Sequence, residues 1–139
     1  MGSIRVVYDT NVLVSGIGFG GTPWRCLFHV FMGDVDLLVS EAILDEFQRV
    51  MGYDRLPFTE EERDRFPSLL EAEAMVVDPE IDIRAIDDDP DDDMFIECAV
   101  AGDADFVVSG DRHLTELGTV RDVPIVDPAL FLSIIEGEP

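Results

Sequence analysis

The segment Ile4-Arg-Val-Val-Tyr-Asp-Thr-Asn11 contains the pattern that decides the fold class of this chain. Its first five residues are mostly β-branched or aromatic, which is typical of a strand, and a carboxylic acid follows them directly. Similar short runs occur at 35–39, 75–77, 106–108 and 125–126. Longer stretches with helical periodicity separate these runs. Strands that alternate with helices predict an α/β fold with a parallel sheet.

Helix starts are marked at four places in the sequence. They are Thr22 before Pro23, Ser40, the capping box of Thr59 with Glu62, and Pro128. We predict helices from these points, the second to about residue 51 and the last through residue 135. Pro67 should break or restart the third helix, because proline lacks the N–H that a helix interior uses. Trp24 lies on the apolar stripe of the first helix, so we expect it in the core.

Length and composition predict one domain over residues 1–139. The chain has 139 residues, of which 47% are hydrophobic, and this is enough to form a core. The longest uncharged apolar run, Thr10–Phe19, is well short of the ~20 residues of a membrane span, and no signal peptide is recognisable. We therefore expect a cytoplasmic protein without a membrane segment. Cys26 and Cys98 encode neither a disulfide framework nor a zinc site, and we expect both as buried free thiols.

The charge balance excludes some functions and restricts others. The chain has 31 acidic residues against 9 basic ones, contains no lysine, and carries a formal net charge of −22. Chemistry that needs a lysine, such as a P-loop or a Schiff base, is excluded. This charge should repel nucleic acid at ordinary salt concentration. Either the partner is not nucleic acid, or the protein works at salt concentrations that screen the repulsion. The composition resembles that of salt-accumulating halophiles, and we favour the second interpretation.

Two aspartates stand where predicted parallel strands end. Asp9 follows the strand at 4–8, and Asp111 follows the strand at 106–108 after a Ser-Gly pair. Ligand sites of open α/β sheets form at this edge of the sheet. An aspartate in such a place can also serve only as a turn or helix cap, and for either residue alone this is the better interpretation.

A third acid, Glu46, is selected by helical geometry. On the helix after Ser40, the apolar residues occupy one sector, and Glu46 lies at its border, about 60° from Ile43 at ~100° per residue. Its side chain should therefore point toward the edge of the sheet rather than into solvent.

A fourth acid is expected from the aspartate-rich segment at 86–93, which opens the next helix. Asp92 falls between Ile96 and Ala99 on the inner side of that helix, whereas Asp93 should project away from it. A buried carboxylate without a partner costs several kcal/mol, so an inward Asp92 needs one. Helix capping explains an acid in the first turn but not its inward direction.

The four acids are expected to converge on one crevice and to bind a cation. Clustered carboxylates repel and raise each other's pKa unless a cation lies among them, and hard oxygen ligands suit Mg²⁺ or Mn²⁺. Such an ion can orient a water molecule, lower its pKa and stabilise the charge that develops at a phosphodiester. We therefore expect Asp9, Glu46, Asp92 and Asp111 to be catalytic residues and metal ligands, directly or through water.

Four segments of the chain carry a family resemblance. They are Val-Val-Tyr-Asp9-Thr-Asn11-Val-Leu-Val-Ser, Ser40-Glu-Ala-Ile-Leu-Asp-Glu46-Phe, Asp89-Pro-Asp-Asp92-Asp-Met-Phe-Ile-Glu and Ala104-Asp-Phe-Val-Val-Ser109-Gly-Asp111. In this order and at these spacings they resemble the PIN-domain ribonucleases. The resemblance covers nearly the whole chain, and it is nearest to the subgroup described as toxins of toxin–antitoxin pairs.

This resemblance implies a mostly parallel five-stranded sheet flanked by helices and a Mg²⁺- or Mn²⁺-dependent endoribonuclease. It maps the acidic site onto the same four acids, with Asn11 and Ser109 as supporting polar groups. His113 stands where many relatives carry another acid, so a fifth ligand is in doubt. We further expect RNA as the substrate, a cognate antitoxin as a partner, and a homodimer.

Two alternative functions remain open at this point. The segment 16–21 matches GxGxxG, and Glu41 follows it at the distance expected in a dinucleotide-binding fold. Against this, the glycines come after Asp9-Thr-Asn rather than at the end of the first strand, and a flexible loop beside the crevice is the simpler interpretation. The other alternative is a domain that binds RNA or a protein partner without turnover.

Overall fold

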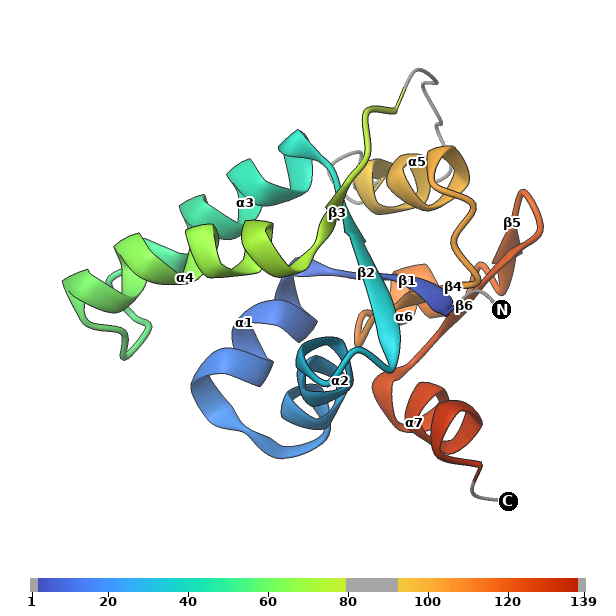
Figure 1. The fold of residues 1–139 in the computed structure, drawn as a ribbon, viewed down its shortest axis with the longest axis horizontal. Coiled ribbons are helices and arrows are strands. Elements are labelled where there is room, and N and C mark those ends of the chain that lie inside the picture. Colours follow the sequence, from blue (N-terminus) through green and yellow to red (C-terminus); the bar gives the residue numbers. More distant parts are fainter. Residues whose placement is uncertain (1–2, 80–92, 138–139) are drawn as a thin grey trace.

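The computed structural model describes residues 3–79 and 93–137 of the chain (Figure 1). The elements in chain order are β1 (Ile4–Tyr8), α1 (Thr10–Phe19), α2 (Gly21–Phe31), β2 (Val35–Val39), α3 (Glu41–Met51), α4 (Glu60–Glu73), β3 (Met75–Val76), α5 (Asp93–Ala101), β4 (Phe106–Val108), α6 (Arg112–Thr115), β5 (Thr119–Val120), β6 (Val123–Val126) and α7 (Pro128–Glu136). None of the helices in this part of the chain is long and apolar enough to cross a bilayer.

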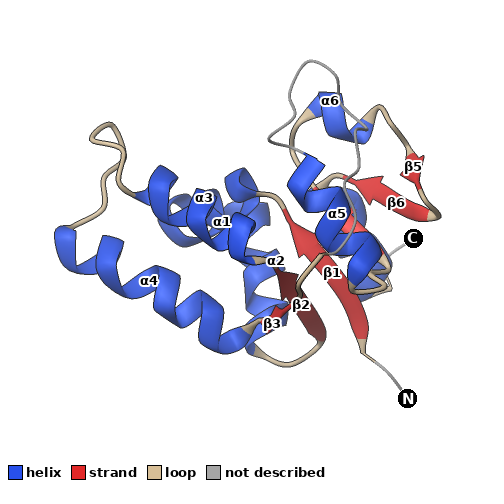
Figure 2. Ribbon diagram, turned by 90° about the horizontal axis from the view of Figure 1, so that it is seen from above, coloured by secondary structure: helices blue, strands red, loops and turns tan. Residues whose placement is uncertain are grey.

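The strands form one sheet in the order β3-β2-β1-β4-β6-β5. All neighbours are parallel except β5 and β6, which are antiparallel. The prediction of an α/β fold with a mostly parallel sheet is confirmed. The parallel part has the five expected strands, and the short β5 adds a sixth at the edge. Figure 2 shows α3 and α4 side by side beyond the β3 edge, with β5 at the opposite end.

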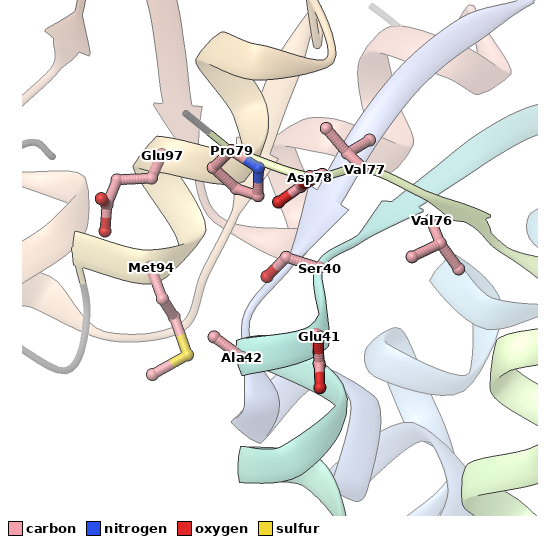
Figure 3. Close-up of a pocket in the computed structure, with 9 residues that line it drawn as sticks. All are labelled: Ser40, Glu41, Ala42, Val76, Val77, Asp78, Pro79, Met94 and Glu97. Atoms are coloured by element: carbon pink, nitrogen blue, oxygen red, sulfur yellow. The ribbon is translucent and has the colours of Figure 1, made fainter. Parts of the chain in front are cut away.

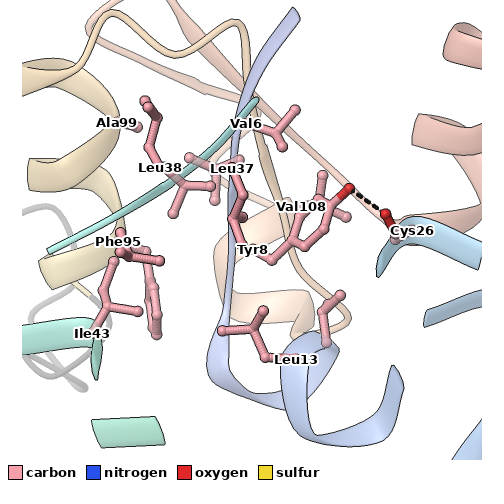
Figure 4. Close-up of a cluster of buried hydrophobic side chains, with 14 of the residues drawn as sticks. Val6, Tyr8, Leu13, Cys26, Leu37, Leu38, Ile43, Phe95, Ala99 and Val108 are labelled. Atoms are coloured by element: carbon pink, nitrogen blue, oxygen red, sulfur yellow. Dashed lines mark hydrogen bonds between the residues drawn. The ribbon is translucent and has the colours of Figure 1, made fainter. Parts of the chain in front are cut away.

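Helices cover both faces of the sheet (Figure 1). On one face, α5 packs against β1, β2 and β4. On the other face, α2 and α7 lie together, and the Tyr8 hydroxyl of β1 donates a hydrogen bond to the Cys26 carbonyl of α2 at 2.9 Å (Figure 4). Phe131 of α7 meets the Tyr8 ring edge-on, with 5.9 Å between the centroids. The central strands are therefore buried on both sides, as their continuous apolar sequences require.

The chain order places a switch point beside β1. After β1 the chain builds β2 and β3 on one side, and then returns through α5 to form β4 on the other. Crevices of open α/β sheets form outside the carboxyl ends of the strands where the order reverses in this way. Here those ends are Tyr8 and Val108, which are register partners.

The segment Thr10–Phe19 forms the helix α1, which the sequence analysis did not predict. Gly16 lies inside it, and a Cβ there would come within 2.6 Å of Leu27 Cδ1 and 2.8 Å of the Pro23 carbonyl. The glycine therefore allows α1 and α2 to approach closely. The flexible-loop interpretation of this region was wrong for Gly16 and Gly18, because both are helical. Within the segment 16–21, positive φ occurs at the helix junction, at Gly20 (72°) and Gly21 (68°).

Two further expectations about helices need correction. Helix α4 continues through Pro67 without a break, with the Thr59–Glu62 capping box in place. Proline removes only one hydrogen bond of this 14-residue helix, and the rest of the ladder holds it. Trp24 is 44% exposed, so its placement in the core was wrong. Helix α2 buries Cys26, Leu27 and Val30 instead, and the predicted burial of both Cys26 and Cys98 is confirmed.

Candidate active site

A cavity of about 120 Å³ lies at the switch point of the sheet. Its lining residues come from the end of β1, from α1, α3 and α5, and from the segment after β4; they are Asp9, Thr10, Asn11, Glu46, Val50, Phe95 and Asp111. The structure thus brings three of the four predicted acids, and Asn11, around one cavity. The residues are far apart in sequence, and the crossover from β1 to β4 is what gathers them.

Asp9 is the most deeply buried acid of this cavity, at 3% exposure. It caps α1, since its Oδ1 accepts a hydrogen bond from the Val12 amide at 2.9 Å. Burial raises the pKa of Asp9 to about 6, although the hydrogen bonds from Ser109 and Val12 act to lower it, and the charge of Asp111 adds to the rise. The ionised form of Asp9 is therefore unfavourable in the folded protein, and a nearby cation would stabilise it.

Ser109 and Asp111 support this carboxylate from the segment after β4. The fully buried Ser109 hydroxyl donates a short hydrogen bond to Asp9 Oδ2 and accepts one from the Asp111 amide at 3.0 Å. Asp111 caps the short helix α6, with its Oδ1 accepting a hydrogen bond from the His113 amide at 2.9 Å. Both aspartates thus are caps, as the simpler interpretation held. They also face the same cavity, which capping does not require.

Glu46 reaches the cavity from α3. The helical-face prediction for α3 is confirmed, because Ile43, Phe47 and Met51 are buried and the opposite side is exposed. Glu46 lies between these two sides, with 12% of its side chain exposed, and it forms an ion pair with Arg49. The 3.6-residue period was sufficient to place this residue, since α3 buries a single face against the rest of the domain.

The acid expected from α5 requires a correction. Asp92 lies outside the described residues, so its position stays a prediction. Asp93, which was expected to project away, is buried at 4% exposure, and that expectation was wrong. Helix α5 also buries Phe95, Ile96, Cys98 and Ala99. These four residues and Asp93 together span an arc of roughly 220° at ~100° per residue. The sequence analysis assumed a narrower inner side, and Asp93 falls within the wider one.

The cavity continues into a larger hollow along α3. A neighbouring cavity of about 440 Å³ shares Glu46 with the acidic cavity, and Arg49 and Met94 also line it. That cavity shares Ala42 and Met94 with a third one, of about 520 Å³, between the start of α3 and α5 (Figure 3). The three acids therefore line one end of a groove rather than an isolated pocket.

The donor groups of the acidic cavity suit a hard divalent cation. They are carboxylate, amide and hydroxyl oxygens, which Mg²⁺ and Mn²⁺ prefer. Within the described ranges, no three acidic, histidine or cysteine side chains are gathered closely enough to hold one ion. Mg²⁺ keeps several of its waters and is commonly bound through only one or two carboxylates, so Asp9 with Asp111 or Glu46 is a sufficient set.

Comparisons with known proteins agree with this geometry. The sequence model of one family, described as PIN domain, matches residues 5–113, which include Asp9, Glu46, Ser109 and Asp111. No curated protein matches the chain. Among solved structures, a chain of VapBC2 from Rickettsia felis bound to a DNA fragment from their promoter has a TM-score of 0.63. It is 11% identical, and the match covers 89% of this chain and 98% of that one, which is a likeness of fold.

Proposed function

We propose that this chain, which belongs to the PIN-domain family, is a metal-dependent endoribonuclease that acts as the toxin of a toxin–antitoxin pair. PIN domains are generally nucleases, so hydrolysis of a phosphodiester is the starting point. The observation that carries the proposal is the convergence of Asp9, Glu46 and Asp111 on one cavity at the switch point of the sheet. A merely structural role would not require three carboxylates to line the same cavity there.

Mg²⁺ or Mn²⁺ is the proposed cofactor. Asp9 and Asp111 would hold it, with Glu46 and an acid at the start of α5 as further ligands, directly or through water. Bound there, the ion would supply a water of lowered pKa and positive charge near the phosphate. The choice is supported by the burial of Asp9, whose raised pKa reflects an uncompensated charge.

The residues of the chain have separate tasks in this hydrolysis. Ser109 fixes the Asp9 carboxylate through its hydrogen bond, and Asn11 at the cavity rim can bind the substrate backbone. The oxygen of a water molecule forms the new bond to phosphorus, and the bond from phosphorus to the leaving ribose oxygen breaks. A carboxylate of the cavity accepts the proton of the water, and the leaving oxygen takes up a proton from solvent.

The groove along α3 supports an RNA strand as the substrate. It leads from Glu46 past Arg49, whose side chain is 58% exposed, to the apolar surface of Met94. Arg49, beside its ion pair with Glu46, can donate a hydrogen bond to a phosphate, and Met94 can contact a base. The net charge of −22 opposes RNA binding, so we place the activity in a salt-rich cytoplasm where the repulsion is screened.

A protein partner is supported by exposed apolar side chains on α2. Trp24, Phe28 and Phe31 are each more than two fifths exposed. Large apolar residues grouped on a surface are typical of interfaces. We propose a cognate antitoxin as the partner, and a homodimer as the assembly of the toxin. Expression of the chain should stop the growth of a host cell, and expression of Asp9→Asn should not.

The direct test is cleavage of single-stranded RNA by the purified protein in molar KCl. We expect cleavage with Mn²⁺ or Mg²⁺ and none with a chelator. Asp9→Asn keeps the shape of the side chain but removes its charge, and it should lower cleavage by at least ~100-fold.

Asp127→Asn is the matched control, because Asp127 also caps a helix directly after a parallel strand but does not line the cavity. It should cleave like the native protein. Equal cleavage by native protein and Asp9→Asn would exclude the proposed site. RNA binding without cleavage under any metal condition would instead favour a domain that binds without turnover.

The dinucleotide alternative has no support in the described residues. Gly16 and Gly18 are part of α1, and a Cβ at Gly18 would come within 2.6 Å of the Phe58 ring. Their backbone amides are therefore inside a packed helix rather than in a loop that could approach a pyrophosphate.

A further inference from the structure

Thr10 has a buried hydroxyl without a partner at the wall of the acidic cavity. It is the first residue of α1, directly after Asp9, and it is 7% exposed. Its Oγ1 has no hydrogen-bond partner within the described residues. The other unpaired buried side-chain atom in this part of the chain is Arg63 Nε, whose guanidinium is otherwise bonded to the Tyr53 and Leu56 carbonyls. Thr10 has no such second contact.

Helix capping does not explain the hydroxyl of Thr10. Threonine at a helix start usually caps, but Asp9 already accepts the hydrogen bond from Val12. Threonine at a buried position has no advantage over valine, which has the same shape, unless its hydroxyl forms a hydrogen bond. Thr10 lines the cavity with Asp9, Glu46 and Asp111, so a molecule held at this wall of the cavity is the nearest candidate partner for the hydroxyl.

The chemistry of the cavity indicates which molecule this is. Three carboxylates line it, and without a cation among them they would repel a phosphate oxygen. A water molecule can donate one hydrogen to a carboxylate and the other to the Thr10 hydroxyl. The cavity of about 120 Å³ has room for a few waters at ~30 Å³ each. A water held in this way keeps both lone pairs of its oxygen, and they point away from both acceptors.

We propose that Thr10 is a positioning residue that holds a water molecule beside Asp9 in this cavity. The inference deepens the proposed hydrolysis and rests on it for its consequence, because the water so held would be the one that the bound ion activates for the reaction. The placement of the water itself can be tested without any activity. Asp9 contributes negative charge to the site, and Thr10 orients the water molecule.

The first test is a pair of crystal structures, of the native protein and of Thr10→Val, grown from KCl without substrate. We expect an ordered water within hydrogen-bond distance of Thr10 Oγ1 and of a carboxylate oxygen in the native crystal, and its loss in Thr10→Val. A native crystal in which Oγ1 bonds to another protein group, or has no water, would overturn the inference. This result does not depend on cleavage, so it is separate from any failure of the proposed function.

The second test is kinetic and thermal. Thr10→Val should lower kcat for RNA cleavage by ~10–100-fold with KM unchanged, the scale of supporting residues at metal sites. Thr10→Ser retains the hydroxyl and should recover most of kcat. Without metal, Thr10→Val should melt at the same temperature as the native protein or higher, since an unpaired hydroxyl is removed.

The exposed Thr119 of β5 provides the control variant, Thr119→Val, which should leave kcat unchanged. A loss of kcat in Thr10→Val that is matched by a fall in melting temperature, and is not recovered by Thr10→Ser, would show a packing role and refute the proposal.

Discussion

The hydroxyl of Ser109 donates a hydrogen bond to the carboxylate of Asp9 across 100 residues of sequence. Both residues directly follow neighbouring parallel strands, and the Asp9 amide donates to the Val108 carbonyl at 3.0 Å in the same place. The pairing of β1 with β4 is therefore what aligns the two side chains. This contact fixes one oxygen of Asp9, while the amide of Val12 fixes the other.

Ser109→Ala should destabilise the protein by about 1–3 kcal/mol, because a buried carboxylate and the Asp111 amide each lose a partner. It should also raise the pKa of Asp9 further, since the hydrogen bond from Ser109 lowers it. Denaturant unfolding measures the first effect. Ser68→Ala, at an exposed position of α4, is the control and should change stability by less than ~0.5 kcal/mol. Similar stabilities of the two variants would contradict the importance of the Asp9 contact.

Asp9→Asn should make the metal-free protein more stable at neutral pH. The folded pKa of Asp9 is raised to about 6, so the protonated form is favoured in the fold. Its contribution to stability is fully present below the unfolded pKa of about 3.8 and is lost as the pH rises through 6. We compare the unfolding free energy of the variant with that of the native protein at each pH. This difference should favour the variant by up to about 3 kcal/mol more at pH 7.5 than at pH 4, at ~1.4 kcal/mol per pKa unit.

Unfolding at several pH values, with chelator present, gives this difference directly. Asp127→Asn serves as the cap control and should show no comparable gain between the two pH values. If Asp9→Asn were less stable than the native protein at every pH, the carboxylate would be compensated by the fold itself, and the case for a cation would fail.

Substitutions at Asp92 and Asp93 decide which acid α5 contributes. Because Asp93 is buried at the start of α5, we expect Asp93→Asn to reduce the rise in melting temperature with Mn²⁺ more than Asp92→Asn does. A ligand that binds only the folded state stabilises it by mass action, so the rise reports the metal affinity. The reverse order would assign the role to Asp92, as the sequence pattern predicted.

His29 should make stability depend on pH above its ordinary pKa of 6.5. Its ring nitrogens bond to Asp34 at 2.8 Å and to Glu136 of α7 at 2.9 Å, and Glu136 also pairs with Arg25. Burial acts to lower the pKa of His29, but the bonds to Glu136 and Asp34 outweigh it and raise the pKa above 6.5. The contribution of this contact is therefore fully present below pH 6.5 and lost as the pH rises through the raised pKa.

His29→Gln should remove this dependence and cost about 1 kcal/mol at pH 6 but little at pH 9. The unfolding free energies of the variant and the native protein at these two pH values measure it. His113→Gln, at an exposed position, is the control. A cost that is the same at both pH values would mean that the charge of His29 has no part in holding α2 to α7.

The protein should be poorly folded in dilute buffer and stable in molar KCl. A net charge of −22 on 139 residues repels itself, and the Debye length falls from ~30 Å at 0.01 M to ~3 Å at 1 M salt. Cleavage of RNA should persist or rise with salt, opposite to proteins that bind phosphates through many basic residues. Full stability together with tight RNA binding at 50 mM salt would refute the halophilic interpretation.

The sequence alone determined the features that depend on neighbouring residues. The strand runs predicted the parallel sheet, and the caps at Ser40 and Thr59 marked their helices, because capping uses groups within one turn. The position of Glu46 was readable because α3 buries a single face, and one face is what the 3.6-residue period reports.

The tertiary structure decided which residues are buried where an element packs against several others. Helix α1 exists because Gly16 and Gly18 let it pack closely against Leu27 and Phe58, which lie later in the chain. Asp93 is buried because α5 packs against three strands and α3 at once, so its buried arc is wider than its apolar stripe. The hydrogen bond from Ser109 to Asp9 likewise follows from the pairing of β1 with β4, which no local pattern records.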